Sequence, residues 1–283
     1  MMAVFITEGL RSMGDAWKPL DGRVALITGG SRGIGAAITK KLASWGATVA
    51  VGYVDHPREA KRILADLEKD GVESSLHRAD LSDPNDVSRL VQEVGDLYGH
   101  INILIQNAAA TKFVELSEAS LEQWQFVQDT NSRATWLLAK YALAFMKEQE
   151  GARLITITNS TTTRIIERAG LFAAAKAGVE AITKYLSYEL APHGIVANCV
   201  RPGLVQTRVM RVRPDFAYGV EHEHNVTPWP GGRTTTAESS ADAVALLCLP
   251  EASWIAGQTI TVDGGYRLWG MLPMSSRSRK RSI

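Results

Sequence analysis

A glycine-rich turn near the start of the chain has the composition of a phosphate-binding loop. Its residues are Thr28, Gly29, Gly30, Ser31, Arg32, Gly33, Ile34 and Gly35. Glycines let the backbone turn tightly and approach a pyrophosphate, which then lies at the positive N-terminus of the following helix. Glycine loops alone are weak evidence, but this one follows an apolar strand pattern and opens a helical one, as the chemistry requires. The loop therefore predicts a dinucleotide site.

A lysine in the second half of the chain has an aromatic neighbour one helical turn away. Phe172 precedes Lys176 by four residues, so the two side chains share one helix face. This segment resembles the active-site helix of the short-chain dehydrogenase/reductase family, which has a tyrosine at the position of Phe172. In that family the tyrosine moves a proton while a nicotinamide moves hydride, and the lysine lowers the tyrosine pKa. Positioned acid–base groups commonly contribute about 10²–10⁴ in rate, so the resemblance predicts a site without its usual proton relay.

Further segments between about residues 20 and 266 resemble this family's cofactor-binding motifs, in the family's order. They match the pair that contacts adenine, the Asn-Asn-Ala-Gly segment after the fourth strand, the lysine that bonds the nicotinamide ribose, the Pro-Gly segment that holds the carboxamide, and the closing strand. The chain departs from the second motif at Gln106 and Ala109, but its asparagine can still meet the ribose. The cofactor contacts that the resemblance implies are Asp80, Leu81, Asn107, Ala108, Lys176, Pro202, Gly203, Val205 and Thr207.

Residue types at the end of the second predicted strand favour NADP(H) over NAD(H). An acidic residue there would accept hydrogen bonds from a ribose 2′-hydroxyl and repel a phosphate. The chain has Gly52 and Tyr53 at this point, and Asp55 follows later, in the turn. Arg32 in the glycine loop can pair with a 2′-phosphate through a forked, charged contact. We therefore expect NADP(H) as the cofactor, the alternative being a surface arginine without this role.

The resemblance also supplies candidates for the remaining active-site positions. Asn131 matches the asparagine that holds a water in the family's proton chain. The serine that touches substrate lies thirteen residues before the tyrosine, and that count leads to Asn159. Ser160 takes the role if the following loop is one residue shorter, and either side chain can donate to a substrate oxygen. A hydroxyl-rich loop without such a role is the alternative.

Phe172 leaves three interpretations of the activity open. In the first, which we expect, the protein is an NADP(H)-dependent reductase of a C=N bond or an activated C=O or C=C bond, and Phe172 is a dry apolar wall. An iminium carbon already carries positive charge, so hydride alone completes its reduction, whereas a carbonyl needs a proton from Glu167, Ser160 or water. In the second, the cofactor pocket serves cyclisation or another non-redox step. In the third, the protein binds a cofactor without turnover.

Charged residues near these positions can bind an anionic substrate or stabilise developing negative charge. Arg133 lies two residues after Asn131, and the loop before the active-site helix contains Arg164, Glu167 and Arg168. Arg133 and Glu167 are the candidates for charge or proton work. A solvated loop is the alternative.

Two further resemblances indicate specialised metabolism. The loss of the tyrosine resembles the reductases of fungal indole-alkaloid pathways, which reduce an iminium-type intermediate and can guide a cycloaddition. Their loop motif with proline and aspartate is matched only in part by residues 167–171. The lead-in Lys18–Val24 is similar to that of polyketide and naphthol reductases. Because a fold does not determine a substrate, the substrate, its stereochemistry and the direction of reaction stay open.

Alternating strands and helices must position these residues. Strands are predicted at Arg23–Thr28, Thr48–Tyr53, Ser74–Arg78, Asn102–Gln106, Arg153–Thr158 and Ile195–Val200, with a closing strand that ends near Val262. The predicted helices between them include Ile34–Trp45 and Pro57–Lys69. Near-continuous apolar strands between amphipathic helices predict an α/β fold with a doubly wound parallel sheet covered on both faces. Its ligand site lies beyond the carboxyl ends of the strands.

Length and composition predict a single globular domain. The chain has 283 residues, of which 45% are hydrophobic and 22% charged, and its net charge of +1 gives no argument for a nucleic-acid partner. No apolar run approaches the roughly 20 residues of a membrane span. Cys199 and Cys248 lie in apolar runs, which predicts buried thiols in a reducing, cytoplasmic setting. The predicted segments are an N-terminal tail at 1–20, an NADP(H)-binding domain at 21–270 with a substrate loop at about 208–235, and a basic tail at 271–283.

An apolar helix face predicts self-association. The residues concerned are Trp136, Leu137, Leu138, Tyr141 and Phe145. Core packing explains part of this face. Because the family pairs through the long helices after its fourth and fifth strands, the resemblance implies a homodimer or homotetramer. The only other partner we expect is a small-molecule substrate.

Overall fold

The computed structural model describes residues 17–205 and 235–268. Several predicted features lie outside the described residues: the first 16 residues, Thr207, the substrate loop up to residue 234 and the basic tail at 271–283. The glycine loop, the active-site helix and the ends of all the predicted strands lie inside them.

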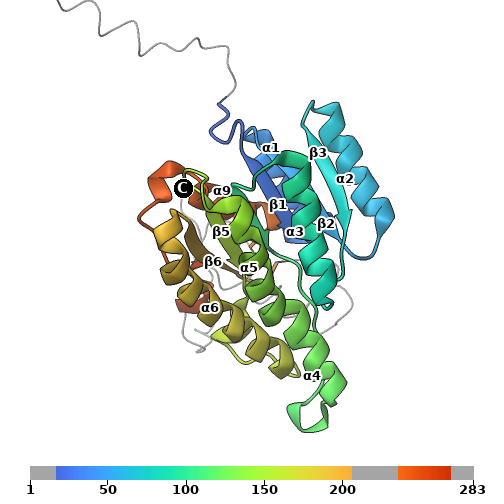
Figure 1. Ribbon diagram of the computed structural model, residues 1–283. Coiled ribbons are helices and arrows are strands. Elements are labelled where there is room, and N and C mark those ends of the chain that lie inside the picture. Colours follow the sequence, from blue (N-terminus) through green and yellow to red (C-terminus); the bar gives the residue numbers. More distant parts are fainter. Residues whose placement is uncertain (1–16, 206–234, 269–283) are drawn as a thin grey trace, which may run out of the picture.

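One parallel sheet runs through the described part of the chain, with the strand order β3-β2-β1-β4-β5-β6-β7 (Figure 1). The strands are β1 (Val24–Thr28), β2 (Thr48–Tyr53), β3 (Ser74–Arg78), β4 (Ile103–Gln106), β5 (Arg153–Ile157), β6 (Val196–Pro202) and β7 (Thr259–Val262). Thr28 pairs with Gln106, and Gln106 pairs with Thr156, so the carboxyl ends of β1, β4 and β5 meet at one edge. The strand order reverses between β1 and β4, where doubly wound sheets bind ligands. The predicted fold class is confirmed.

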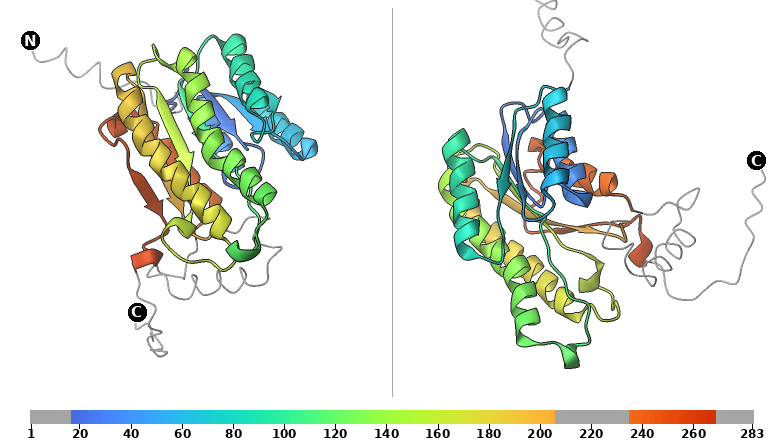
Figure 2. Two further views of the ribbon diagram at one scale, coloured as in Figure 1. Left: turned by 60° about the horizontal axis from the view of Figure 1, so that its bottom comes forward. Right: turned by 90° about the vertical axis from the view of Figure 1, so that its right-hand side faces the viewer.

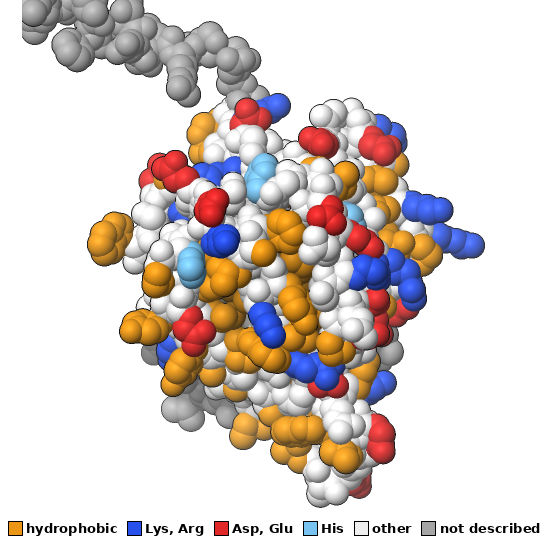
Figure 3. All heavy atoms as spheres, in the orientation of Figure 1, with side chains coloured by type: hydrophobic (Ala, Val, Ile, Leu, Met, Phe, Trp, Pro, Cys, Tyr) orange, Lys and Arg blue, Asp and Glu red, His pale blue; other side chains and the backbone are white. Residues whose placement is uncertain are grey.

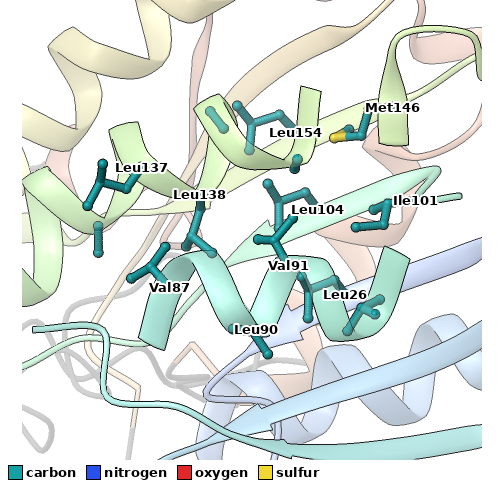
Figure 4. Close-up of a cluster of buried hydrophobic side chains, with 14 of the residues drawn as sticks. Leu26, Val87, Leu90, Val91, Ile101, Leu104, Leu137, Leu138, Met146 and Leu154 are labelled. Carbon is teal, nitrogen blue, oxygen red and sulfur yellow. The ribbon is translucent and has the colours of Figure 1, made fainter. Parts of the chain in front are cut away.

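Helices cover both faces of this sheet (Figure 2). One layer contains α3 (Pro84–Tyr98), α5 (Ala134–Met146) and α6 (Gly170–Leu190), and the other contains α1 (Gly33–Ser44), α2 (Pro57–Lys69) and α9 (Ala237–Leu247). Successive strand residues face opposite layers. In β1, Leu26 belongs to the cluster with Val91 of α3, shown in Figure 4, whereas Ile27 belongs to the cluster with Ile38 of α1. This double burial explains the near-continuous apolar strands.

The folded part of the chain begins before residue 21. Leu20, which the sequence prediction placed in the tail, is fully buried in the same cluster as Ile38. Its backbone N–H donates to the carbonyl of Trp45 at 2.9 Å, and the Trp17 ring packs edge-on against Trp45 with 4.8 Å between ring centroids. These contacts join the lead-in segment to the C-terminal end of α1.

Both cysteines are buried free thiols, as predicted. Burial raises the pKa of Cys199 to about 11 and that of Cys248 to about 12, which disfavours the reactive thiolate. Among the helices of the described residues, none is long and apolar enough to cross a membrane.

Candidate active site

The glycine loop passes too close to neighbouring backbone for larger residues. A Cβ added to Gly35 would lie 2.1 Å from the carbonyl oxygen of Gly29, and one added to Gly29 would lie 3.0 Å from Cα of Ala108. Gly29 and Gly33 have positive φ angles of 63° and 53°, a conformation that glycine adopts without a steric penalty. The loop therefore presents bare backbone at the N-terminus of α1, as the sequence predicted.

Thr28 and Asn107 hold this loop to the end of β4. Nδ2 of Asn107 donates to the carbonyl oxygens of Thr28 at 3.0 Å and Gly29 at 3.1 Å. Oγ1 of Thr28 accepts hydrogen bonds from the backbone N–H groups of Asn107 and Ala108, both at 3.1 Å. The side chain of Asn107, which was expected to meet the ribose, thus supports the shape of the loop. Its contact with a ribose stays a prediction.

An exposed arginine lies at the part of the site where the adenosine of a dinucleotide is expected. Arg32 is the exposed N-cap residue of α1, and its guanidinium forms no hydrogen bond or ion pair within the described residues. Tyr53 ends β2 and pairs with Arg78 at the end of β3. Arg78 is exposed and its Nε donates to the carbonyl of Val54 at 3.2 Å. The sequence reasoning missed this second cation, although its place at the end of β3, beside β2, could have indicated it.

Asp80 and Leu81 form the turn after β3. Oδ1 of Asp80 accepts hydrogen bonds from the backbone N–H and the hydroxyl of Ser82, at 2.9 and 2.7 Å. Leu81 is buried. The exposed carboxylate of Asp80 is therefore held in one orientation, and its contact with an adenine stays a prediction.

Asn131 lies in a widened helical turn between α4 (Leu121–Gln128) and α5. This turn, η2 (Asp129–Arg133), is a π-helix, an insertion that often marks functional positions. Nδ2 of Asn131 donates to the carbonyls of Ala110 and Val127, both at 2.8 Å. Its Oδ1 is buried and has no hydrogen-bond partner among the described residues. A buried amide oxygen needs a donor, so this atom suits the water that the sequence predicted here.

Lys176 is buried beside the ring of Phe172. Its Nζ donates to the carbonyl of Ile157 at 2.7 Å and lies 5.6 Å from the centroid of the phenylalanine ring. Burial lowers the pKa of Lys176 to about 8, because the charged ammonium loses its hydration. The structure thus brings together the two side chains that the helix spacing predicted, and the face beside the ammonium is hydrocarbon.

The turn after β5 carries both candidates for the serine position. Oδ1 of Asn159 accepts hydrogen bonds from the backbone N–H and the hydroxyl of Thr161, at 3.1 and 2.5 Å, so this side chain caps η3 (Ser160–Thr162). The hydroxyl of Ser160 forms no hydrogen bond with any residue that the structure describes. The Ser160 hydroxyl and Nδ2 of Asn159 are therefore both available as donors within the described residues, and the contact of Ser160 with substrate stays a prediction.

The predicted charged residues are bound elsewhere or exposed. Nη1 of Arg133 pairs with Asp129 at 2.9 Å, and its Nη2 donates to the carbonyl of Ser82. Arg164 donates to the carbonyl of Tyr266 at 2.9 Å and stacks on that ring at 4.2 Å. Glu167 is exposed. Within the described residues, no hydrogen bond or ion pair joins these groups to the Phe172–Lys176 pair.

The end of β6 lies beside β7. The N–H of Gly203 donates to the carbonyl of Val262 at 2.9 Å. Pro202 and Val205 are buried. This arrangement extends the Pro-Gly segment along the end of β7, where the resemblance places the nicotinamide carboxamide.

Comparison with known proteins identifies the family. The family model described as enoyl-(acyl carrier protein) reductase matches residues 29–267. A short-chain type dehydrogenase/reductase from Picea abies is 33% identical over 256 residues, which is 87% of this chain and 93% of that protein. The chain belongs to the short-chain dehydrogenase/reductase family of oxidoreductases. The 3-oxoacyl-[acyl-carrier-protein] reductase FabG of Vibrio cholerae is another member, 32% identical over 87% of this chain and 98% of its own length.

Two solved structures with a bound cofactor have related folds. A short-chain dehydrogenase from Burkholderia cenocepacia in complex with NADP has a TM-score of 0.80 and 32% identity, and covers 88% of this chain and 99% of its own. A blue fluorescent protein from a metagenomic library, in complex with NADPH, has a TM-score of 0.80 and 31% identity over the same shares. Both neighbours hold a phosphorylated dinucleotide. The bare glycine loop and exposed Arg32 of this chain fit such a group.

Proposed function

We propose that this protein is an NADP(H)-dependent reductase of specialised metabolism that reduces a C=N bond, above all an iminium, or an activated C=O or C=C bond without a tyrosine acid. The observation that carries the proposal is the Phe172 ring, 5.6 Å from the buried ammonium of Lys176. The cofactor cradle is built as a dinucleotide needs, while the phenol of the family's proton relay is absent. A substrate that needs hydride but no proton from the protein is consistent with a dinucleotide site that lacks this phenol.

The proposed cofactor preference rests on charge. Arg32 stands exposed at the N-terminus of α1, and no acidic residue occupies the end of β2 at Gly52 and Tyr53. A 2′-phosphate gains a forked contact with a guanidinium there and meets no carboxylate from residues 52 and 53. The NADP and NADPH complexes of the two structural neighbours support this choice.

Each side chain has a distinct task in the proposed reaction. NADPH supplies the hydride when it is bound. Lys176 orients the nicotinamide ribose with its ammonium, and Ser160 donates to a polar substrate atom. Phe172 excludes water from the reacting carbon, because its ring replaces a hydrogen-bonding phenol by hydrocarbon. Asn131 accepts from a buried water through its Oδ1, which has no hydrogen-bond partner in the described part of the chain.

A pair of substrate classes tests the proposal. We expect the wild-type protein to oxidise NADPH with a small cyclic imine, protonated in solution, and to reduce a β-keto ester slowly. The change Phe172→Tyr should raise reduction of the β-keto ester by about 10²–10⁴ and leave imine reduction within the same order of magnitude. NADPH oxidation followed by absorbance measures both.

One result would contradict the reductase proposal, and another would contradict the role given to Lys176. Tight NADPH binding without oxidation by either probe would favour cyclisation in the cofactor pocket or binding alone. Imine reduction that survives Lys176→Ala unchanged would remove the ribose-orienting role from the site.

We also propose that the protein forms a homodimer or homotetramer through α5 and α6. A groove of about 620 Å³ lies between these helices, lined in part by Trp136, Ile182 and Tyr185. Trp136 is 48% exposed and Tyr185 71% exposed, while Leu138 of the same predicted face is buried in the core. Hydrophobic side chains gather on this face of the molecule (Figure 3). Large exposed aromatic groups of this kind are typical of interfaces.

A cytoplasmic location completes the proposal. Cys199 and Cys248 are buried and unpaired, a state that a reducing compartment preserves.

A further inference from the structure

A partly buried carboxylate on α6 binds side chains from three other segments. Oε1 of Glu180 accepts hydrogen bonds from the hydroxyls of Thr158 at 2.9 Å and Thr162 at 2.7 Å. Its Oε2 pairs with Nη2 of Arg201 at 2.7 Å. Glu180 is one helical turn beyond Lys176 on the same helix face. The carboxylate therefore links the active-site helix to the end of β5, the η3 turn and β6.

Arg201 also contacts Thr162 and connects Glu180 to β7. Its Nε donates to Oγ1 of Thr162 at 3.1 Å and to Oε1 of Glu180 at 3.2 Å, and its Nη1 donates to Oγ1 of Thr261 on β7 at 3.2 Å. Arg201 directly precedes Pro202 and Gly203. One guanidinium thus contacts the turn that carries Ser160 and the strand pair that carries the Pro-Gly segment.

This ion pair is shielded from water. The Arg201 side chain is 10% exposed and the Glu180 side chain 19% exposed. A shielded pair contributes little net stability unless its geometry and hydrogen bonds are good, but removal of one partner leaves an uncompensated charge. Here hydrogen bonds occupy both carboxylate oxygens and all three guanidinium nitrogens. Such a pair holds its attached segments in one relative arrangement.

The glycine loop is held by a separate set of contacts. Thr28 and Asn107 fix that loop, and no hydrogen bond within the described residues joins them to Glu180 or Arg201. The glycine loop therefore shares no hydrogen bond with the ion pair.

We propose that Glu180 and Arg201 are positioning residues that hold the Ser160 turn and the Pro202-Gly203 segment against the active-site helix, and so set the geometry of the hydride-transfer end of the site. The effect on the nicotinamide rests on the proposed function, because it requires that the protein binds NADP(H). The positioning of the turn itself does not depend on which cofactor or substrate is used.

Hydrogen exchange of the cofactor-free protein tests the positioning. The backbone N–H groups of Thr163 and Arg164 both bond to the carbonyl of Ser160 and report on the turn. We expect Glu180→Gln and Thr162→Val to accelerate their exchange by about tenfold or more, because each removes hydrogen bonds to a charged partner. The matched control is Thr261→Val, which removes one hydroxyl from the same guanidinium but leaves the turn attached.

The amide of Gly30, which bonds to Gly52 in the glycine-loop region, separates local from global effects. Its exchange should stay unchanged in all these variants. The proposal would be overturned if exchange at Gly30 accelerates as much as exchange in the turn. It would also be overturned if Thr261→Val accelerates exchange in the turn as much as the other variants do, or if exchange in the turn does not accelerate at all. If Glu180→Gln does not fold, the exchange rates of the turn in Thr162→Val and Thr261→Val are sufficient to test the proposal.

Fluorescence of bound NADPH tests the consequence for the cofactor. We expect Glu180→Gln to lower the nicotinamide emission of the bound form toward that of free NADPH, while the dissociation constant stays unchanged. A general loss of stability would not lower the nicotinamide emission while leaving the dissociation constant unchanged. Unaltered emission would contradict the role toward the nicotinamide. If the wild-type protein does not bind NADPH, the proposed function fails, and hydrogen exchange still decides whether the ion pair positions the turn.

Discussion

Arg32 and Arg58 are both exposed arginines at the start of a helix, α1 and α2 respectively, but only Arg32 lies in the glycine loop. We expect Arg32→Ala to weaken NADPH binding by about tenfold or more, since it removes a charge-assisted hydrogen bond, and to leave NADH binding nearly unchanged. Arg58→Ala, on α2, should affect neither. Titration followed by tryptophan fluorescence measures both affinities. An equal loss for the two dinucleotides would show that Arg32 does not contact the 2′-phosphate.

Burial of Lys176 makes stability depend on pH in a predictable direction. Its pKa is lowered from 10.5 to about 8 in the folded protein. Between these values the unfolded chain binds the proton that the folded protein has lost, so wild-type stability rises with pH across this window. The full cost of the buried charge, about 3 kcal/mol, is present below pH 8.

The change Lys176→Met removes this dependence. Relative to wild type, the variant should gain stability most below pH 8, and its advantage should shrink as pH rises toward 10.5. Lys184→Met, at an exposed position of the same helix, should follow the wild-type pH profile. Denaturant unfolding of the cofactor-free protein at a series of pH values measures the difference. A constant offset at every pH would mean that Lys176 keeps its ordinary pKa.

At the scale of elements, two glycines allow close contacts but serve different purposes. A Cβ at Gly35 of α1 would lie 2.1 Å from the Gly29 carbonyl, and one at Gly95 of α3 would lie 2.4 Å from the Phe145 ring of α5. Overpacking typically costs about 1–3 kcal/mol, so Gly35→Ala and Gly95→Ala should both lower the melting temperature. Only Gly35→Ala should also abolish NADPH binding, because it displaces the loop backbone. Comparable affinity in the two variants would place the dinucleotide elsewhere.

At the scale of the whole molecule, the exposed aromatic side chains of α5 and α6 predict a specific association. Tyr185→Glu places a charge in the proposed contact, near Glu189 of the same groove, and should shift the protein toward the monomer. Leu97→Glu, on the exposed part of α3, should leave the mass unchanged. Sedimentation equilibrium at several concentrations measures this. A wild-type monomer at all concentrations would contradict the proposed dimer.

Local patterns in the sequence determined the fold class, the glycine loop and the pairing of Phe172 with Lys176. Strand alternation and helix periodicity are short-range properties, and a spacing of four residues defines a shared helix face wherever the helix lies. The family motifs could therefore be placed by residue number before any long-range contact was known. The choice between Asn159 and Ser160 stayed open in the sequence, because both residues have donors and the loop length was ambiguous.

Only the tertiary structure decided which polar side chains share partners. Asn107 supports the glycine loop from 78 residues away, and Arg133 bonds to Ser82 across 51 residues rather than to the active-site helix. Glu180 and Arg201 had no signal in the sequence, because nothing local distinguishes a buried ion pair from two solvated charges. Strand register and helix packing bring such residues together. Burial then makes the loss of one partner costly in free energy, because the other charge stays uncompensated. The positions that could do chemistry were thus readable from the chain, whereas the contacts that hold them in place came from the packing of distant segments.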